Sequence, residues 1–357
     1  MTRLSTLAVI YLWRKLCSIY TFLRFPHSWS RPSLMLRFET PRQKQAYLSL
    51  KTTDASSVAR LRWSRPPRIL IVIPFRDKWS MTAECLDALM HQDLEDASYL
   101  VALVDNGSTA KETAEGIQRA LEKYQGNCEL RHLRYDVPFN FSRLNNLAVD
   151  DCRDYGADLV CFLNNDVVMT HPNTLRQMAN FLLGNPLVGS VGCSLLYPNH
   201  KIQHLFIAVG CKIVGAHPFK GCPLDLADPW FQAPRPVGAA TAALLMMRRD
   251  LYGEVGGFEE SLPSCYQDVD LALKVQQQGY VNWVLPWITA IHHETQTRSP
   301  KHSWDEVGLM YQRWQKSLTA NPYHSQIWSR WSEPLVLTLG EGDFPWENLR
   351  DRTSVTG

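Results

Sequence analysis

Residues 158–166 read Asp-Leu-Val-Cys-Phe-Leu-Asn-Asn-Asp, so an apolar run ends in two amides and a carboxylate. Five consecutive apolar residues between polar ends are typical of a strand that is buried on both faces of a parallel sheet. Open α/β sheets bind ligands beyond the carboxyl ends of their strands. The stretch therefore predicts an α/β fold and places a candidate site at Asn164, Asn165 and Asp166.

The residues before this strand repeat the pattern three times. Short apolar runs predict strands at 69–73, 100–104 and 128–135. Helices are expected at about 80–91, between the turn at 105–108 and Tyr124, and at 142–151. This alternation predicts a Rossmann-like, doubly wound, mostly parallel sheet. The polar loops at 74–77, 105–108 and 164–166 should then meet at one edge of that sheet.

The pattern changes after residue 188. Strands at 188–196, 203–211, 239–247 and 281–285 are expected to form a smaller mixed sheet, and a helix at 268–278 stops at Gly279. We predict five parts: a basic amphipathic helix (1–25), a linker with one short helix (26–67), an α/β half (68–187), a second half (188–315) and a C-terminal tail (316–357).

The N-terminal part is basic and the remainder is acidic. Residues 1–70 hold 13 Lys/Arg and 2 Asp/Glu, whereas the later residues hold 24 and 33. A basic leader indicates an anionic surface, either membrane or nucleic acid. Nucleic acid is disfavoured because the basic residues alternate with long aliphatic ones instead of forming a recognition motif. Arg14 and Lys15 would each cost about 2.5–3.5 kcal/mol in a spanning helix.

We therefore expect residues 1–25 to lie on a membrane surface, with packing on the protein's own body as the alternative. The nine cysteines include no CxxC pair, which favours a reducing compartment over a disulfide framework or zinc site. No small-residue cleavage site follows the apolar leader. The prediction is a cytoplasmic protein, peripheral on the inner face of the plasma membrane.

Three polar segments offer chemistry. Asn164-Asn165-Asp166 suits a hard divalent cation, although the same residues also serve as turn caps. Asp268 and Asp270 open a helix, so either could cap it, while Asp268 could also act as a general base. His292 and His293 follow a strand, and one of them could complete a metal shell with Asp166 or be structural.

A fourth segment, Pro138-Phe139-Asn140-Phe141-Ser142 with Asn145 and Asn146, precedes the metal-like loop. Amides in the first turns of a helix could hydrogen-bond a base or a sugar. The alternative is a capped helix with a hydrophobic staple, which needs no ligand.

Taken in order, these segments resemble the family 2 glycosyltransferases of the GT-A fold. The similarity is greatest to the branch found in bacterial polysaccharide and lipopolysaccharide assembly, which is often described as rhamnosyltransferase-like. It extends from about Arg68 to Trp314. The matching segments read IVIPFRD, LVDNGS, PFNFSRLNN, FLNNDV, GSVGCSLLYPNHKIQH, AALLMMRRDLYGEVGGFEE, QDVDLALKV and HHETQTR.

The resemblance implies a role for each matched residue. The first half would bind the nucleotide-sugar donor, and the smaller mixed sheet would complete the acceptor side. Asp166 would bind Mn²⁺ or Mg²⁺ with His292 or His293, and Asp268 would be the catalytic base. The nucleotide-sugar site would be formed by Pro74, Asp77, Asp105, Asn106, Asn145, Asn164 and Asn165.

The implied activity is an inverting, metal-dependent transfer from a nucleotide-diphosphate sugar to a glycan or lipid-linked glycan. One metal site and one base suffice for a single in-line displacement. Three departures from the family pattern stand out: the triplet offers one carboxylate, Gln267 precedes the base, and residues 312–314 do not form the QxxRW of processive synthases. A non-processive enzyme is therefore expected.

Two other readings remain open. A catalytically inactive nucleotide-sugar-binding or scaffold module would share the fold, although Asp105, Asp166, Asp268 and His292 are all retained. A sugar nucleotidyltransferase needs a glycine-rich loop after the first strand to hold a triphosphate. Residues 74–77 read Pro-Phe-Arg-Asp and contain no glycine, so that reading is disfavoured.

Overall fold

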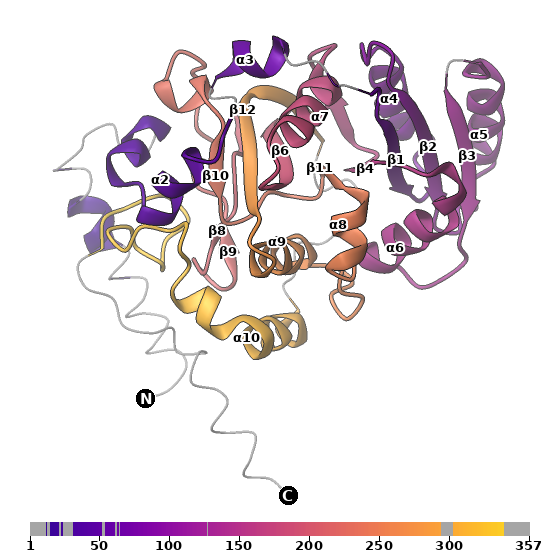
Figure 1. Cartoon of the computed structure of the whole chain (residues 1–357). Coiled ribbons are helices and arrows are strands. Elements are labelled where there is room, and N and C mark those ends of the chain that lie inside the picture. The colour runs from indigo at the N-terminus through magenta and orange to yellow at the C-terminus, as the bar shows by residue number, and fades with distance from the viewer. Residues whose placement is uncertain are drawn as a thin grey trace, which may run out of the picture.

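The structure is a computed structural model of the chain (Figure 1). It describes residues 31–338 apart from 52–53, 61–62, 64, 127 and 294–302, together with residues 12, 15–20 and 23. A large sheet runs through the molecule, and helices cover both of its faces (Figure 1). The predicted α/β fold is confirmed.

Four parallel strands form the first half of the sheet. They are β1 (Arg68–Phe75), β2 (Ser98–Asp105), β3 (Glu129–Arg134) and β4 (Leu159–Leu163), in the spatial order β4-β1-β2-β3. The connecting helices are α4 (Trp79–Met90), α5 (Lys111–Lys123) and α6 (Phe141–Asp151), and a short 3-10 helix, η3 (Arg153–Tyr155), precedes β4. These bounds confirm the elements predicted for this half.

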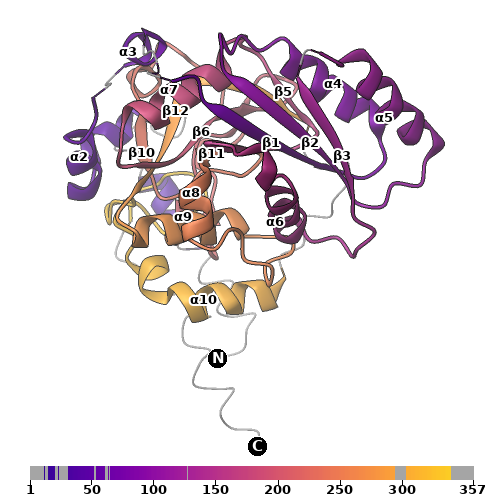
Figure 2. The same cartoon turned by 45° about the vertical axis from the view of Figure 1, so that its right-hand side comes forward.

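Alternate residues of β1 pack into two separate hydrophobic clusters, because successive side chains of a strand point to opposite faces. Ile69, Ile71 and Ile73 join the cluster under α4, α5 and α7 (Thr174–Gly184). Leu70 and Val72 join the cluster under α6, α8 (Arg249–Glu254) and α9 (Gln267–Gln277). Figure 2 shows α4 and α5 on the opposite side of the sheet from α6.

The strands of the second half extend the same sheet. β6 (Val188–Leu196), β10 (Arg235–Val237), β11 (Leu244–Arg248) and β12 (Val281–His292) continue it in the order β10-β12-β6-β11-β4. β5 (Val167–Met169) pairs with β12, and β7 (Ile202–His204) pairs with β6. The separate small sheet consists of β8 (Ala208–Val209) and β9 (Gly215–Ala216).

Two predicted strands are shorter than expected. The run at 203–211 is divided between β7 and β8, and the run at 239–247 becomes a loop that leads into β11. In that loop the backbone N–H of Thr241 donates to the His204 ring, 3.3 Å away, instead of to a neighbouring strand. Apolar runs of this kind report burial, and burial is possible without a β-ladder.

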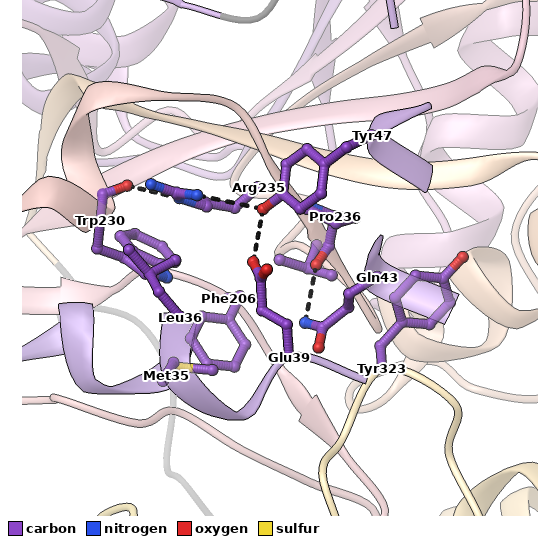
Figure 3. Close-up of a pocket in the computed structure, with 11 residues that line it drawn as sticks. Met35, Leu36, Glu39, Gln43, Tyr47, Phe206, Trp230, Arg235, Pro236 and Tyr323 are labelled. Atoms are coloured by element: carbon purple, nitrogen blue, oxygen red, sulfur yellow. Dashed lines mark hydrogen bonds between the residues drawn. The ribbon is translucent and has the colours of Figure 1, made fainter. Parts of the chain in front are cut away.

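Residues 26–67, expected as a linker with one short helix, contain η2 (Pro32–Phe38), α2 (Pro41–Tyr47) and α3 (Ala55–Arg60) within their described part. η2 packs near η4 (Pro229–Gln232) and α2 near β10, both in the second half, whereas α3 packs on α7 in the first half. Figure 3 shows the junction: Tyr47 donates to Glu39 Oε1 (2.8 Å), Arg235 donates to the Tyr47 hydroxyl (3.2 Å), and Gln43 donates to the Pro236 carbonyl (3.3 Å). These residues line a small pocket between the N-terminal helices and the body. Because their polar groups are bonded to one another, they hold the two parts together.

The last described helix, α10 (Trp304–Thr319), crosses the boundary that we predicted at residue 315. It packs against α9 in a third cluster that includes Met310, Trp314 and Leu318. Most of the predicted N-terminal helix at 1–25 and residues 339–357 of the predicted tail lie outside the described residues. Among the described helices, none combines the length and the apolar character needed to cross a bilayer.

Candidate functional site

The loops after β1 and β2 meet through Asp77. Its Oδ1 accepts hydrogen bonds from the backbone N–H groups of Thr109 and Ala110, both at 2.9 Å, and its own N–H donates to Ser108 Oγ at 2.8 Å. Asp77 and Lys78 both have positive φ, 52° and 46°, a conformation that is uncommon outside glycine. The bonds of Asp77 therefore hold a sharp turn directly beyond Pro74, at the carboxyl end of the sheet.

Asp105 ends β2 and is almost fully buried. Its Oδ1 accepts from the Ser108 N–H (2.7 Å), and its Oδ2 lies 3.4 Å from His132 Nε2 and 3.1 Å from Arg134 Nη1. Burial alone would raise the pKa of this carboxyl, but the hydrogen bonds from His132 and Ser108 and the charge of Arg134 outweigh it and lower the pKa to about 2. Asp105 is thus an ionised acceptor at the sheet edge.

Two of the four asparagines predicted in the nucleotide-sugar site are engaged within the protein. Asn106 Nδ2 donates to the carbonyls of Tyr135 (3.1 Å) and Val137 (2.8 Å), which ties the loop after β2 to the loop after β3. Asn145 is fully buried in α6 and donates to the Phe141 carbonyl at 2.8 Å. The Asn106 contacts thus support two loops of the site, whereas the Asn145 contact lies within α6.

Asp166 and His292 lie side by side although 126 positions separate them in the chain. β5 pairs with the end of β12 in a register that sets His292 opposite Val167, the residue after Asp166. As a result, Asp166 Oδ1 lies 3.2 Å from His292 Nε2, and each side chain is 13% exposed. The His293 N–H donates to the Asp166 carbonyl at 3.0 Å, which strengthens the same pairing.

The rest of the triplet anchors this loop. Asn164 N–H donates to the Ala243 carbonyl at 2.9 Å, and Asn165 Nδ2 donates to Thr82 Oγ1 on α4 at 3.0 Å. Sequence reasoning offered both a turn cap and a ligand for these amides. The Asn165 side chain connects the end of β4 to α4, and the Asn164 backbone connects it to the residue before β11, while the Asp166 side chain faces His292.

The pair of Asp166 and His292 fits a divalent cation. Two ligands at adjacent corners of an octahedral shell with bonds of about 2.1 Å lie about 3 Å apart, close to the observed 3.2 Å. The described residues contain no group of three or more His, Cys, Asp or Glu side chains arranged to hold a metal. The protein therefore offers two ligands here, and the remaining positions suit the oxygens of a diphosphate and water.

Asp268 lies at the start of α9. Its Oδ1 accepts from the Val269 N–H at 2.9 Å, and it is also hydrogen-bonded by the Ala242 backbone and the Thr241 side chain. Burial raises the pKa of this carboxyl, and the hydrogen bonds only partly oppose that shift. A carboxylate with a raised pKa is a better proton acceptor, which is what a general base requires.

Asp270, two residues later, has a different environment. It is fully buried, its Oδ1 accepts from Trp314 Nε1 (2.7 Å) and lies 3.2 Å from Arg313 Nε, and its Oδ2 lies 3.0 Å from Lys274 Nζ. These contacts join α9 to α10. Asp270 therefore faces α10 and has a structural role.

Two neighbouring residues of β7 contact the surroundings of the two candidate carboxylates. His292 Nδ1 lies 2.7 Å from Gln203 Oε1, and the next residue, His204, accepts from the Thr241 N–H that neighbours Asp268. His204 Nδ1 also lies 2.9 Å from His217 Nδ1, and burial together with the neighbouring His217 and His292 lowers the pKa of His204. β7 thus contacts His292 through Gln203, and through His204 it contacts the backbone of Thr241, whose side chain is hydrogen-bonded to Asp268.

Sequence reasoning assigned no role to Gln203, His204 and Thr241. The matched segment ending in Lys-Ile-Gln-His contains the first two, but a Gln-His pair in an apolar run carries no signal by itself. Their contacts reach residues 89 and 37 positions further along the chain, so only the tertiary structure shows them.

An open pocket lies next to the pair of Asp166 and His292, because His293 lines it. It is lined by Lys78 and Ser80 from the turn after β1 and the start of α4, by Met81 and Glu112, and by His293. Lys78 supplies a positive charge next to a position that suits a diphosphate. Residues that follow β1, β2 and β12 in the chain therefore border one hollow.

Residues 70–204 match the family model for glycosyl transferase family 2. The chain contains a family 2 glycosyltransferase domain. The matched segment covers β1 to β7 and so includes Asp77, Asp105, Asp166 and Gln203, whereas Asp268 and His292 follow it.

Three curated relatives show the same similarity. The chain is 31% identical over 269 residues to the uncharacterized protein y4gI of Sinorhizobium fredii and 31% identical over 235 residues to the O-antigen biosynthesis protein RfbC of Myxococcus xanthus. It is 27% identical over 210 residues to an N-acetylglucosaminyl-diphospho-decaprenol L-rhamnosyltransferase of Mycobacterium tuberculosis. The alignments cover 72%, 65% and 54% of this chain and 29%, 18% and 66% of the relatives, so the chain spans less than a third of the first two.

Two solved glycosyltransferase structures share the fold. The mannosyltransferase PcManGT of Pyrobaculum calidifontis, in complex with GDP-Man and Mn²⁺, aligns with a TM-score of 0.52 and 17% identity over 86% of this chain and 76% of its own. GalNAc-T7 with UDP, GalNAc and Mn²⁺ aligns with a TM-score of 0.53 and 12% identity over 72% and 53%. The predicted GT-A type of fold is thereby confirmed.

Proposed function

We propose that this chain is an inverting, metal-dependent, non-processive glycosyltransferase that uses a nucleotide-diphosphate sugar. The observation that carries the proposal is the pair of Asp166 and His292, together with the contacts of β7 with His292 and with the Thr241 backbone beside Asp268. The pair suits a cation that holds a diphosphate, and Asp268 is a half-buried carboxylate with a raised pKa. Those are the two requirements of a single displacement at an anomeric carbon.

In the proposed reaction, an acceptor hydroxyl oxygen attacks the anomeric carbon while the bond from that carbon to the diphosphate oxygen breaks. The electron pair of the broken bond stays on the nucleoside diphosphate. Asp268 takes the hydroxyl proton, which its raised pKa favours. Asp166 and His292 would hold Mn²⁺ or Mg²⁺, which supplies positive charge for the departing diphosphate.

The donor site follows from the sheet edge. Asp105 is ionised and lies next to Asn106, where a ribose hydroxyl or a base N–H could donate to it. Pro74, Asp77, Asn164 and Asn165 belong to the loops at the carboxyl ends of β1 and β4, which would form the rest of the donor site, and Asn145 would act from within α6. Asp166 and His292 are the metal ligands in this proposal, while His293 lines the pocket where the diphosphate would lie.

The acceptor is proposed to be a glycan or a lipid-linked glycan of a bacterial surface polysaccharide or lipopolysaccharide. The sugar transferred to it from the donor would be a hexose or rhamnose. Two relatives support this class, because one is named for O-antigen biosynthesis and another for rhamnosyl transfer to a diphospho-decaprenol. A lipid-linked acceptor also agrees with the proposed contact of residues 1–25 with the cytoplasmic face of the membrane.

The full chain, incubated with a panel of nucleotide-sugars and a glycan acceptor extract, tests the proposal through release of free nucleoside diphosphate. We expect release with one donor class in Mn²⁺ or Mg²⁺ and loss of release in EDTA. A chain that binds a nucleotide-sugar but releases no diphosphate under any condition would instead be a binding or scaffold module. Release of pyrophosphate from a nucleoside triphosphate and a sugar phosphate would identify a nucleotidyltransferase.

A further inference from the structure

Gln203 holds His292 at two points. It lies on β7, is 5% exposed, and its Oε1 lies 2.7 Å from His292 Nδ1 while its Nε2 donates to the His292 carbonyl at 3.2 Å. One side chain thus contacts both the ring and the backbone of the same residue. This geometry specifies the orientation of the imidazole as well as its distance from β7.

The two contacts together determine which ring nitrogen carries the proton. The His292 carbonyl can only accept, so the amide nitrogen of Gln203 must face it and the amide oxygen must face the ring. An amide oxygen also only accepts, so His292 Nδ1 must be the donor. A neutral imidazole has a single N–H, and Nε2 therefore carries a lone pair.

That lone pair faces a carboxylate. In this neutral state His292 Nε2 and Asp166 Oδ1 are both electron-pair donors at a separation of 3.2 Å, so a positive centre between them, either a metal ion or a proton on Nε2, makes the contact favourable. Metal-binding histidines generally donate their other ring N–H to a neighbouring acceptor, which sets the tautomer and raises the basicity of the ligand. Gln203 occupies the place of that acceptor.

We propose that Gln203 is a positioning residue that holds His292 in the tautomer and orientation required to bind a divalent cation together with Asp166. This inference rests on the proposed function, since it concerns the same cation. The backbone of β7 is held independently by its pairing with β6, where Leu195 lies opposite His204 and Leu196 opposite Ile202. Replacing the Gln203 side chain therefore leaves the strand in place.

The test measures Mn²⁺ binding by the full chain, from the EPR signal of the free ion. UDP, GDP or dTDP is present, whichever stabilises the wild type most in thermal unfolding. We expect Gln203→Leu to weaken Mn²⁺ binding by about 10- to 100-fold, and His292→Ala to weaken it at least as much. Gln177→Leu is the matched control. Gln177 is also buried, and its side chain accepts a hydrogen bond at 2.8 Å from Nε1 of Trp287, which lies on β12 like His292. We expect it to bind Mn²⁺ like the wild type.

A second measurement, on the metal-free protein, is independent of binding. It uses ¹⁵N NMR of the histidine side chains, in which the His292 signals are assigned by their loss in His292→Ala. We expect Nδ1 to be protonated in the wild type and in Gln177→Leu. In Gln203→Leu we expect a changed tautomer population. Wild-type Mn²⁺ affinity in Gln203→Leu, with weak binding by His292→Ala, overturns the inference alone. Equal affinity of His292→Ala and the wild type overturns the proposed metal site, and this inference with it.

Discussion

At the scale of single residues, the environment separates side chains that are chemically identical. Asp268 and Asp270 are two positions apart on α9, yet burial raises the pKa of Asp268, whereas Asp270 is held by Lys274, Arg313 and Trp314. A helix turns by about 100° per residue, so positions two apart face nearly opposite directions. One carboxylate is therefore available for proton transfer and the other holds two helices together.

We expect Asp268→Asn to keep nucleotide-sugar binding and lose at least about 100-fold in turnover, as for the loss of a general base. Turnover by the wild type should decline as the pH falls toward the raised pKa of Asp268, because a protonated carboxyl cannot accept a proton. The usual pKa of an aspartate is about 4, so the decline should begin at a higher pH than for an ordinary aspartate. Donor titrations and pH profiles of kcat measure both effects. Turnover unchanged in Asp268→Asn would rule out this role.

Asp270→Asn is the matched comparison. It removes a buried charge that is paired with Lys274 and Arg313, and breaking a buried ion pair costs about 3–5 kcal/mol. Thermal unfolding should therefore show a lower Tm for Asp270→Asn, whereas Asp268→Asn, which removes a carboxylate disfavoured by burial, should not lower Tm. The opposite order of the two Tm values would contradict this assignment.

At the scale of elements, helix packing explains a residue that propensity alone disfavours. Gly116 lies in the middle of α5, where glycine is less favourable than alanine by about 1 kcal/mol. A Cβ at this position would lie 2.2 Å from the ring of Trp79 at the start of α4. The glycine thus allows α5 to pack closely on α4, the helix that follows the turn at Asp77.

We expect Gly116→Ala to destabilise the protein by about 1–3 kcal/mol, because overpacking outweighs the gain in helix propensity. Gly308→Ala is the control, since Gly308 is exposed in the middle of α10 and an added Cβ there meets no atom within 4 Å. That substitution should stabilise by up to about 1 kcal/mol. Denaturant unfolding of the two variants decides the point, and a stabilised Gly116→Ala chain would show that α4 and α5 are not packed in this way.

At the scale of the whole molecule, charge and exposed apolar side chains are concentrated at the N-terminal end. Of the predicted helix at 1–25, the described residues Leu12, Leu16, Ile19 and Leu23 are 44–74% exposed. Their spacing of four, three and four residues places them on one side of a helix. Combined with the basic charge of residues 1–70, this pattern supports the proposed contact with an anionic membrane surface.

Deleting residues 1–25 should release the protein from vesicles that contain phosphatidylglycerol while soluble activity is retained. The measurement is co-sedimentation with these vesicles, with pure phosphatidylcholine vesicles as the control for charge. We expect the wild type to bind the anionic vesicles more tightly and to dissociate as salt is raised, because surface charges are screened. Equal sedimentation of the truncated and full-length chains would disprove the membrane contact.

Much of the fold could be predicted from the sequence. The apolar run at 159–163 and its polar end identified β4 and the loop that carries Asp166, and the alternation before it identified β1 to β3 with their helices. These features are local, because burial on both faces of a strand and the 3.6-residue period of a helix appear directly in neighbouring residues. The second half was less predictable, since its buried loops at 205–207 and 238–243 are as apolar as strands.

The sequence by itself determined that this protein is an α/β chain whose polar loops meet at one edge of a sheet. Only the tertiary structure decided that Asp166 faces His292, that Gln203 holds that histidine, and that His204 reaches the loop beside Asp268. The physical reason is that hydrophobic pattern reports how deeply a residue is buried and not what it contacts. Contacts between residues far apart in the chain depend on strand register, and shifting β5 by one position along β12 would turn its side chains to the opposite face.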